Sequence, residues 1–294
     1  MRIAVCVKQV LDTSISFEID EKNGGLVEDG LVYILNPADR CAVEEAVRLK
    51  EKQGSGEVTV ITLGPARARE ALRECLAIGA DSALHLLDKA FDESDAYSTG
   101  VALAAAIKSL NCDLVLCGSE SLDEGSSQVG ATIAELLDLP QVSAVTQVQP
   151  AAGLKHVAVQ RRLDRGAREA VECPLPAVLT VDVGINEPRY ASLPSYMEAL
   201  LKEIKVCNLE ALSVREQEVG KRGALTKNLG LAPIRPRTKK TFAADAAIDP
   251  MEKLRMMMSG QSAKPTSDVL QGDPDFLAQQ ILRFLKQHGL TTEG

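Results

Sequence analysis

DLVLCGSESLDEGSSQVGATIA, residues 113–134, is the stretch that decides the fold class of this chain. Its apolar run over residues 114–117 predicts a buried strand, a polar loop with glycines follows over 118–130, and helix-forming residues begin at Ala131. A strand, a loop of small residues and a helix N-terminus favour an anion site, because backbone N–H groups and the helix dipole point into the loop. An ordinary surface loop has the same pattern, so the rest of the chain must decide whether a nucleotide binds here.

The region before this stretch alternates between strand-like and helix-like segments. Short apolar runs predict buried strands, and segments with apolar residues on one face predict helices between them. Asp39 is expected to cap the first helix, and Ser94 or Asp95 the third. Asn23-Gly24-Gly25 lies between two strand-like runs and predicts a hairpin. The expected order is strand 3–7, hairpin 15–35, helix 39–53, strand 58–63, helix 67–78, strand 83–87 and helix 95–110.

This alternation predicts an α/β fold with a mostly parallel sheet. Parallel strands joined by helices need right-handed crossovers, and the helices then cover both faces of the sheet. Such sheets bind ligands at the carboxyl ends of their strands, near the point where the strand order reverses. The loops after Val7, Leu63 and Cys117 would open on that edge, together with residues 36–39. Four polar or glycine-bearing loops at one edge favour a nucleotide site.

The pattern changes after residue 140. Alternating apolar and polar residues predict antiparallel strands that extend the same sheet and do not form a second domain. The expected elements are strands 142–148, 155–163 and 167–172, a buried strand 177–183, a loop 186–190 and a helix 193–202.

The apolar periodicity weakens beyond residue 207. Residues 220–241 carry several Gly, Pro and basic residues and predict an extended arm, followed by short helices at 250–258 and 274–288. Such a segment cannot build a core of its own, so we expect it to pack on another subunit. The predicted division is a nucleotide-binding domain over residues 1–206 and a C-terminal arm over 207–294.

Charge and composition exclude several kinds of partner. The net charge is −8, and no cluster of Lys and Arg is interleaved with aromatic residues, so nucleic acid is not expected. The N-terminus has no basic and apolar leader pattern, and no window approaches the roughly 20 apolar residues of a transmembrane segment. The seven cysteines are scattered, which is typical of a reducing compartment, and we expect a cytoplasmic protein.

The sequence contains no set of side chains for bond-breaking catalysis. Its three histidines lie far apart, no Ser/His/Asp set emerges, and no C-x-x-C pair indicates zinc. Asp123 and Glu124 could bind a metal, but no third ligand accompanies them. We therefore predict neither catalytic residues nor a metal site.

A set of short motifs occurs in one order along the first two thirds of the chain. The motifs are VKQV (7–10), NP (36–37) before AVEEAVRLKE (42–51), EAL (70–72) with AIGAD (77–81), DLVL (113–116) with Gly118, Gln128 with Gly130, LPAVLT (175–180) and NEPRYASLP (186–194). Each motif alone is weak, but with the ordered set the chain resembles the β subunit of electron transfer flavoproteins over residues 1–206.

The resemblance implies a Rossmann-like fold of the adenine nucleotide α-hydrolase type and a heterodimer with a flavin-bearing α subunit. Such a heterodimer passes electrons between flavin dehydrogenases, of the acyl-CoA type or others, and an acceptor. The flavin supplies the redox chemistry, and the protein supplies position and electrostatics. In this family the β subunit holds AMP or, in the electron-bifurcating group, a second FAD.

The resemblance also assigns residues to these roles. Leu193 corresponds to an exposed leucine that inserts into a pocket of the dehydrogenase, and the alternative is a buried residue at a helix start. The residues that correspond to nucleotide contacts are Cys6, Asn36, Pro37, Ala38, Asp39, Leu63, Gly118, Ser119, Glu120, Ser121, Leu122, Asp123, Glu124, Gly125, Ser126, Ser127, Gln128 and Val129.

The end of the loop bears on which nucleotide binds. SSQVG at residues 126–130 is closer to the TAQVG of FAD-containing relatives than to the NQTG of AMP-containing ones, and residues 140–143 agree with this. Glu124 stands against FAD, because a carboxylate beside a diphosphate is repelled unless it points away or accepts ribose hydroxyls. We expect FAD, with AMP as the alternative.

Two other functions fit a similar fold. A stand-alone sensor that binds an adenine nucleotide would be a monomer with little use for the C-terminal arm. An ATP-cleaving enzyme of the pyrophosphatase type would need a Ser-Gly-Gly-x-Asp-Ser loop after the first strand, and KQVLD at residues 8–12 is not one. The expected function is therefore that of an electron-carrier subunit, either bifurcating with FAD or non-bifurcating with AMP.

Overall fold

The computed structural model describes residues 1–20, 25–27, 29–150, 155–231, 251 and 272–287. They belong to two compact units, Met1–Pro233 and Ile234–Gly294. The first unit holds the sheet and the helices that cover it. The described part of the second unit includes one long helix, α9 (Pro274–Gln287).

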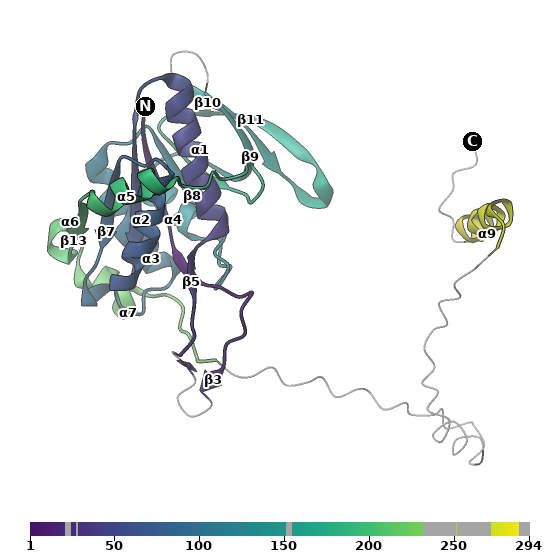
Figure 1. The fold of residues 1–294 in the computed structure, drawn as a ribbon, viewed down its shortest axis with the longest axis horizontal. Coiled ribbons are helices and arrows are strands. Elements are labelled where there is room, and N and C mark those ends of the chain that lie inside the picture. Colours follow the sequence, from purple (N-terminus) through teal and green to yellow (C-terminus); the bar gives the residue numbers. More distant parts are fainter. Residues whose placement is uncertain (21–24, 28, 151–154, 232–250, 252–271, 288–294) are drawn as a thin grey trace. The chain divides into compact units, whose positions relative to one another are not determined.

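A sheet of nine strands, counted over the described residues, forms the centre of the first unit (Figure 1). Seven of these strands, β9, β12, β8, β1, β6, β7 and β13 in spatial order, pair in parallel with their neighbours. At one edge β10 pairs antiparallel with both β9 and β11. The central strands are continuous apolar runs because helices cover both of their faces. In spatial order the strands are β11 (Arg168–Pro174), β10 (His156–Arg162), β9 (Gln141–Pro150), β12 (Ala177–Val181), β8 (Leu114–Gly118), β1 (Arg2–Cys6), β6 (Glu57–Leu63), β7 (Ser82–Leu86) and β13 (Ile204–Cys207).

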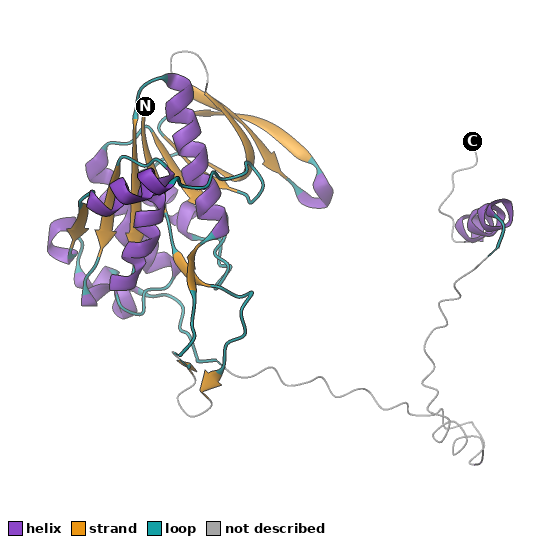
Figure 2. Cartoon of the chain, viewed as in Figure 1, coloured by secondary structure: helices purple, strands orange, loops and turns teal. Residues whose placement is uncertain are grey.

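Helices lie on both faces of this sheet (Figure 2). One hydrophobic cluster joins the sheet to α1, α2 and α5, and a second cluster joins the opposite face to α3 and α4. The helices are α1 (Pro37–Gln53), α2 (Arg69–Ile78), α3 (Ala96–Leu110), α4 (Val129–Leu137), α5 (Leu193–Leu201), α6 (Leu209–Leu212) and α7 (Gly220–Gly223).

Shorter elements complete the unit. β2 (Gln9–Leu11) pairs antiparallel with β5 (Tyr33–Leu35), and β3 (Ile19–Asp20) pairs antiparallel with β4 (Gly25–Leu26). The 3-10 turns are η1 (Ala66–Ala68), η2 (Lys89–Phe91), η3 (Asp164–Gly166) and η4 (Glu216–Glu218).

The strand order reverses beside β1. The chain runs from β1 through α1 to β6 and through α2 to β7, then returns through α3 to β8 on the other side of β1. The carboxyl ends of β1 and β8 therefore flank the switch point of the sheet, where open α/β folds bind ligands.

The helices on the second face pack closely. Gly100 of α3 faces Thr132 of α4, and a Cβ at Gly100 would lie 2.6 Å from the Thr132 Cγ2. The missing side chain lets the two helix backbones approach each other over this face.

The expected α/β fold with a mostly parallel sheet and an antiparallel extension is confirmed. The expected role of Asp39 as a helix cap is wrong: α1 begins at Pro37, and Asn36 occupies the cap position without a side-chain cap bond. Asp39 lies in the first turn, and its carboxylate turns instead to the N–H groups of two strand ends. A proline at the first helical position is favourable because its missing N–H has no partner there.

The region around residue 206 differs from the expectation. Ile204–Cys207 forms β13, an edge strand that pairs with β7 and was not predicted. The first compact unit continues to Pro233, and Leu212 and Val219 are buried within it, so the unit extends beyond the expected boundary at residue 206.

The structure describes only some of the residues in the predicted arm and hairpin. The helix expected at 274–288 is α9. The helix expected at 250–258 lies outside the described residues apart from Met251, and so does Asn23-Gly24 of the hairpin. No helix among the described residues is both long enough and apolar enough to cross a bilayer.

Candidate functional site

A cavity of about 300 Å³ lies at the switch point of the sheet. Residues at the carboxyl ends of β1, β6 and β8 line it, together with the β7–α3 connection and the first residues of α3 and α4. Ligand pockets span roughly 300–1,000 Å³, so this volume suits a small ligand or one part of a larger one. Two helix N-termini at the carboxyl edge of a parallel sheet favour a ligand that carries phosphate.

Asp39 ties together the two strand ends beside the cavity. Its carboxylate accepts hydrogen bonds from the Lys8 N–H at 2.7 Å and from the Gly118 N–H at 2.9 Å. The side chain is almost fully buried, and burial raises the pKa of Asp39 to about 7 although both N–H groups act to lower it. Gly118 needs to lack a side chain here, because a Cβ would overlap the Asp39 carboxylate and lie 2.9 Å from the Ala38 Cβ.

Asn36 fixes the first part of the loop that follows β8. Its Nδ2 donates to the Glu120 carbonyl at 3.0 Å, and its Oδ1 accepts from the Leu122 N–H at 3.1 Å. The Asn36 side chain is buried, so both of its polar atoms are used to hold the loop backbone. Asn36 therefore shapes the loop as well as lining the cavity.

Lys8 connects the loop to the segment after β1. Its Nζ lies 2.9 Å from the Asp123 Oδ2 and 3.3 Å from the Glu124 Oε2. Burial acts to raise the pKa of Asp123, but hydrogen bonds from Ser121 and Lys8 outweigh it and lower the pKa. Both carboxylates therefore face a lysine, which reduces their repulsion of a ligand phosphate.

The start of α4 lines the cavity. α4 begins at Val129, and the N-cap residue Gln128 makes no side-chain cap bond. The backbone turns into the helix through Gly125 and Ser127, both with positive φ. By contrast, Asp95 and Ser98 form a complete capping box at the start of α3. The first N–H groups of α4 are thus the ones best suited to bind a phosphate.

The side chains that line the cavity carry more negative than positive charge. Lys8 is the one Lys or Arg in the described lining, against the carboxylates Asp39, Asp88, Asp92, Glu93, Glu120 and Glu124. A phosphate here would have to be held mainly by backbone N–H groups and helix dipoles, not by cationic side chains.

Two groups near the strand ends, the Cys6 thiol and the His85 imidazole, have pKa values shifted toward the neutral form. Cys6 and Cys117 are opposite each other on β1 and β8, and the Cys117 thiol and burial keep the pKa of Cys6 well above its usual range. Burial lowers the pKa of His85, whose Nε2 lies 3.0 Å from the Gly64 carbonyl oxygen. The described residues also contain no group of three or more His, Cys, Asp or Glu placed to hold a metal ion.

The structure brings most of the predicted nucleotide residues together. The predicted residues that line the cavity are Cys6, Asn36, Asp39, Leu63, Gly118, Ser119, Glu120, Ser121, Glu124, Ser126, Ser127, Gln128 and Val129. The predicted residues outside its lining are Pro37, Ala38, Leu122, Asp123 and Gly125. Direct contact with a nucleotide stays a prediction for all of them.

Sequence reasoning missed one wall of the cavity. The loop after β7 and the first turns of α3 form this wall. The prediction also missed Lys8, which follows β1. Because β7 is parallel to β6, its following loop opens on the same edge, and this signal was present in the strand pattern. The missed residues are Val7, Lys8, Gly64, Pro65, Leu87, Asp88, Phe91, Asp92, Glu93, Ser94, Ala96, Thr99, Leu103, Cys117 and Gly130.

A second surface contains the residue expected to dock a partner. Leu193 is the first residue of α5 and is 74% exposed, and Tyr190 just before it is 90% exposed. The alternative that Leu193 is a buried residue is therefore wrong. Ser192 caps α5, since its hydroxyl accepts a hydrogen bond from the Ser195 N–H at 3.2 Å.

Comparisons with known proteins agree with this architecture. Residues 23–212 match the electron transfer flavoprotein domain. The chain is 43% identical to the electron transfer flavoprotein subunit beta of Thermoanaerobacterium thermosaccharolyticum, over 77% of this chain and 86% of that protein. It is 40% identical to the caffeyl-CoA reductase–Etf complex subunit CarD of Acetobacterium woodii, over 75% and 83%, and 38% identical to the electron transfer flavoprotein subunit beta of Bos taurus, over 73% and 84%.

Proposed function

The chain belongs to the electron transfer flavoprotein family, and we propose that it acts as the β subunit of a heterodimer that carries electrons between a flavin dehydrogenase and an acceptor. Members of this family bind flavin-type cofactors, and their β subunits pair with an α subunit. The observation that supports the role most strongly is the cavity at the switch point, built from the loops that the family resemblance assigns to a nucleotide.

The proposed ligand of the cavity is FAD, with AMP as the alternative. The cavity volume of about 300 Å³ suits the adenosine–phosphate half that both nucleotides share, so the flavin half of FAD would extend out of it. The Gly118 backbone, the loop after it and the start of α4 would hold the phosphate. When bound, FAD supplies the electron-transfer chemistry, and this chain supplies binding and orientation.

The ion pair of Glu124 with Lys8 weakens the main objection to FAD, although Lys8 also pairs with Asp123. The Glu124 carboxylate pairs with Lys8 at 3.3 Å, so its charge is partly neutralised. The likeness of residues 126–130 to FAD-containing relatives then favours FAD and, with it, electron bifurcation. The relation to a subunit of a caffeyl-CoA reductase–Etf complex supports the same proposal.

The nucleotide proposal is tested on the heterodimer. Nucleotides are released from the purified complex with acid and identified by chromatography. Two FAD per heterodimer would support the proposal. One FAD with one AMP would overturn the FAD assignment and leave a non-bifurcating electron carrier.

We also propose that Leu193 docks a flavin dehydrogenase of the acyl-CoA type. It is an exposed apolar residue on a capped helix start, next to Tyr190, and such anchors dominate binding at interfaces. Leu193→Ala should weaken binding to the dehydrogenase by about 2 kcal/mol, or roughly 30-fold. Flavin content and thermal stability should not change, because the side chain packs on no core. Unchanged steady-state kinetics with the dehydrogenase would refute docking through Leu193.

The part of the predicted C-terminal arm beyond the first compact unit, residues 234–294, is proposed to pack on the α subunit. In α9 the side chains of Phe276, Ile281 and Leu282 are 48%, 58% and 51% exposed, and these residues need an apolar partner. A stand-alone sensor is the competing function. Size-exclusion chromatography with light scattering separates the two, because a stable monomer with an intact arm would favour the sensor. The scattered cysteines favour the cytoplasm, which cell fractionation would test.

A further inference from the structure

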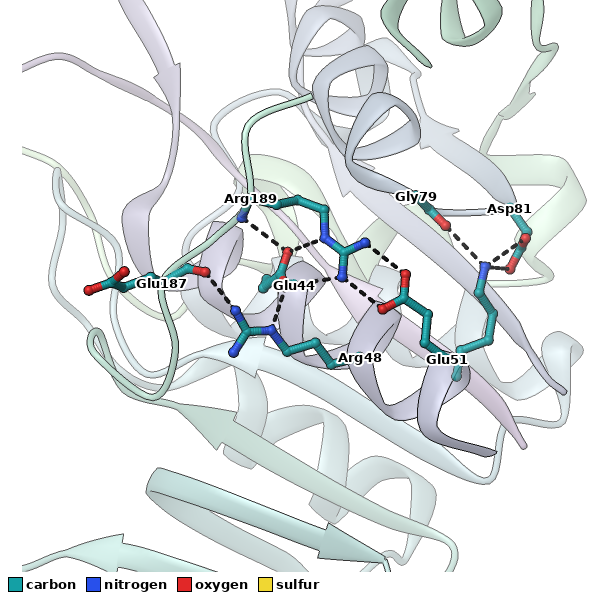
Figure 3. A network of polar contacts seen from close by, with 8 residues as sticks. Glu44, Arg48, Glu51, Gly79, Asp81, Glu187 and Arg189 are labelled. Atoms are coloured by element: carbon teal, nitrogen blue, oxygen red, sulfur yellow. Dashed lines mark hydrogen bonds and ion pairs between the residues drawn. The ribbon is translucent and has the colours of Figure 1, made fainter. Parts of the chain in front are cut away.

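The loop between β12 and α5 is fastened to α1 through a buried carboxylate (Figure 3). Glu44 of α1 is 1% exposed. Its Oε2 accepts hydrogen bonds from the Arg189 N–H at 3.2 Å and from the Arg189 Nε at 2.9 Å. Its Oε1 accepts from the Arg48 Nε at 2.5 Å and from the Arg189 Nη2 at 3.2 Å. Burial acts to raise the pKa of Glu44, but the arginine hydrogen bonds outweigh it and lower the pKa.

Arg189 also binds a second carboxylate on the same helix. Its Nη1 lies 2.7 Å from the Glu51 Oε1, and its Nη2 lies 2.9 Å from the Glu51 Oε2. Glu44 and Glu51 are two helical turns apart, so one planar guanidinium spans both turns of α1. A lysine has no fork and could not serve both carboxylates with this geometry.

Three further hydrogen bonds hold the chain just before Arg189. The Arg48 Nη2 donates to the Glu187 carbonyl at 2.8 Å. The Asn186 Nδ2 donates to the Cys41 carbonyl at 3.0 Å and to the Glu45 Oε2 at 2.9 Å. The backbone of residues 186–189 is therefore held to α1 by side chains at three points.

The chain beyond Arg189 is exposed, yet its far end is also fixed. Tyr190 and Leu193 are 90% and 74% exposed. At the other end of α5, Ala199 is buried, and Arg73 of α2 donates to the carbonyls of Ala199 and Lys202. The apolar residues Tyr190, Leu193, Met197 and Leu201, which we call the docking surface, thus lie between two fastened ends.

We propose that Arg189, held between Glu44 and Glu51, is the positioning residue of the docking surface. This inference rests on the proposed docking of a flavin dehydrogenase at Leu193. Ordering a loop at the moment of binding costs free energy, and a loop that is already ordered avoids this cost. The cluster therefore contributes to partner recognition without touching the partner.

The test compares Arg189→Lys with Arg161→Lys in the complete heterodimer. Arg161 pairs with Glu169 at 2.7 Å across β10 and β11, so the control makes the same chemical change at an ion pair on other strands. Hydrogen exchange is measured at the amides of residues 190–196 other than Pro194. Steady-state kinetics are measured with an acyl-CoA dehydrogenase reduced by butyryl-CoA, with the heterodimer as the varied substrate.

Arg189→Lys should raise hydrogen exchange in residues 190–196 by about tenfold. It should raise the KM for the heterodimer by about five- to tenfold, while kcat and nucleotide content stay near wild type. The melting temperature should fall, because the buried Glu44 loses part of its arginine hydrogen bonds. Arg161→Lys should change none of these quantities. If Arg189→Lys does not fold, Glu51→Gln replaces it, because Glu51 is exposed and its loss strands no buried charge.

The outcomes separate this inference from the docking proposal. Unchanged exchange in residues 190–196 would overturn the positioning role whatever the kinetics show. Raised exchange with a normal KM, in a system where Leu193→Ala raises the KM, would also overturn it. A normal KM for Leu193→Ala would instead refute the docking proposal, and the exchange data would then report only on how the loop is fastened.

Discussion

The protonation of Asp39 gives the sharpest test of how the nucleotide site is built. Two influences oppose each other at this carboxylate: burial favours the neutral acid, and N–H groups of Lys8 and Gly118 favour the anion. Burial dominates and places the pKa at about 7, against 3.8 for an ordinary aspartate. Asp39→Asn cannot titrate, and because its amide NH2 replaces one of the two oxygens that accept from the Lys8 and Gly118 N–H groups, it should also lower stability by an amount that does not depend on pH.

The sign follows from proton linkage. Between pH 3.8 and about 7 the folded protein keeps a proton on Asp39 that the unfolded chain has released, so stability falls as pH rises. With these two pKa values, the loss for this one group between pH 5 and pH 7 is about 2 kcal/mol. The Asn variant does not lose this free energy, so its stability relative to wild type should rise by about 2 kcal/mol over the same interval.

The assay is urea denaturation of the heterodimer at pH 5, 6 and 7, at one protein concentration, for wild type and Asp39→Asn. Other titrating groups contribute to both proteins and cancel in the difference. A difference that stays constant with pH would refute the reasoning, because Asp39 would then be ionised throughout. The same flat difference is expected if the two N–H groups outweigh burial, since Asp39 would then be ionised in both states over this whole interval.

Two further substitutions test close approaches in the fold. Gly118→Ala should destabilise the heterodimer by about 2 kcal/mol and lower its nucleotide content, because the new Cβ overlaps the Asp39 carboxylate; full occupancy measured by absorbance and acid release would contradict this. Gly100→Ala should lower the melting temperature because its Cβ meets Thr132 at 2.6 Å. Adding Thr132→Gly removes both the Cγ2 at 2.6 Å and the Cβ at 2.7 Å and should recover part of the lost stability, and a double variant no better than the single one would refute the contact.

Much of the fold could be predicted from local pattern. The apolar runs of β1, β6 and β8 and the helices between them determine a parallel sheet, and such a sheet has its ligand edge at the carboxyl ends. The exposure of Leu193 also agrees with its position at a capped helix start.

The missed features depend on contacts that are distant in sequence. Asp39 is a residue type that often caps helices, but its carboxylate accepts hydrogen bonds from the N–H groups of two other segments. One of these segments is 79 residues away along the chain. β13 has only one buried residue, Ile204, because it is an edge strand, and so it lacks the apolar run of a central strand. The Arg189 cluster brings together residues 145 positions apart, and no local pattern marks such a pair.

Native mass spectrometry of the chain coexpressed with its α subunit tests the central claim most directly. The account predicts a complex of one α and one β chain and, after gentle dissociation, a β chain that still carries one adenine nucleotide. A β chain that carries no nucleotide under conditions where the α chain keeps its own would contradict the account.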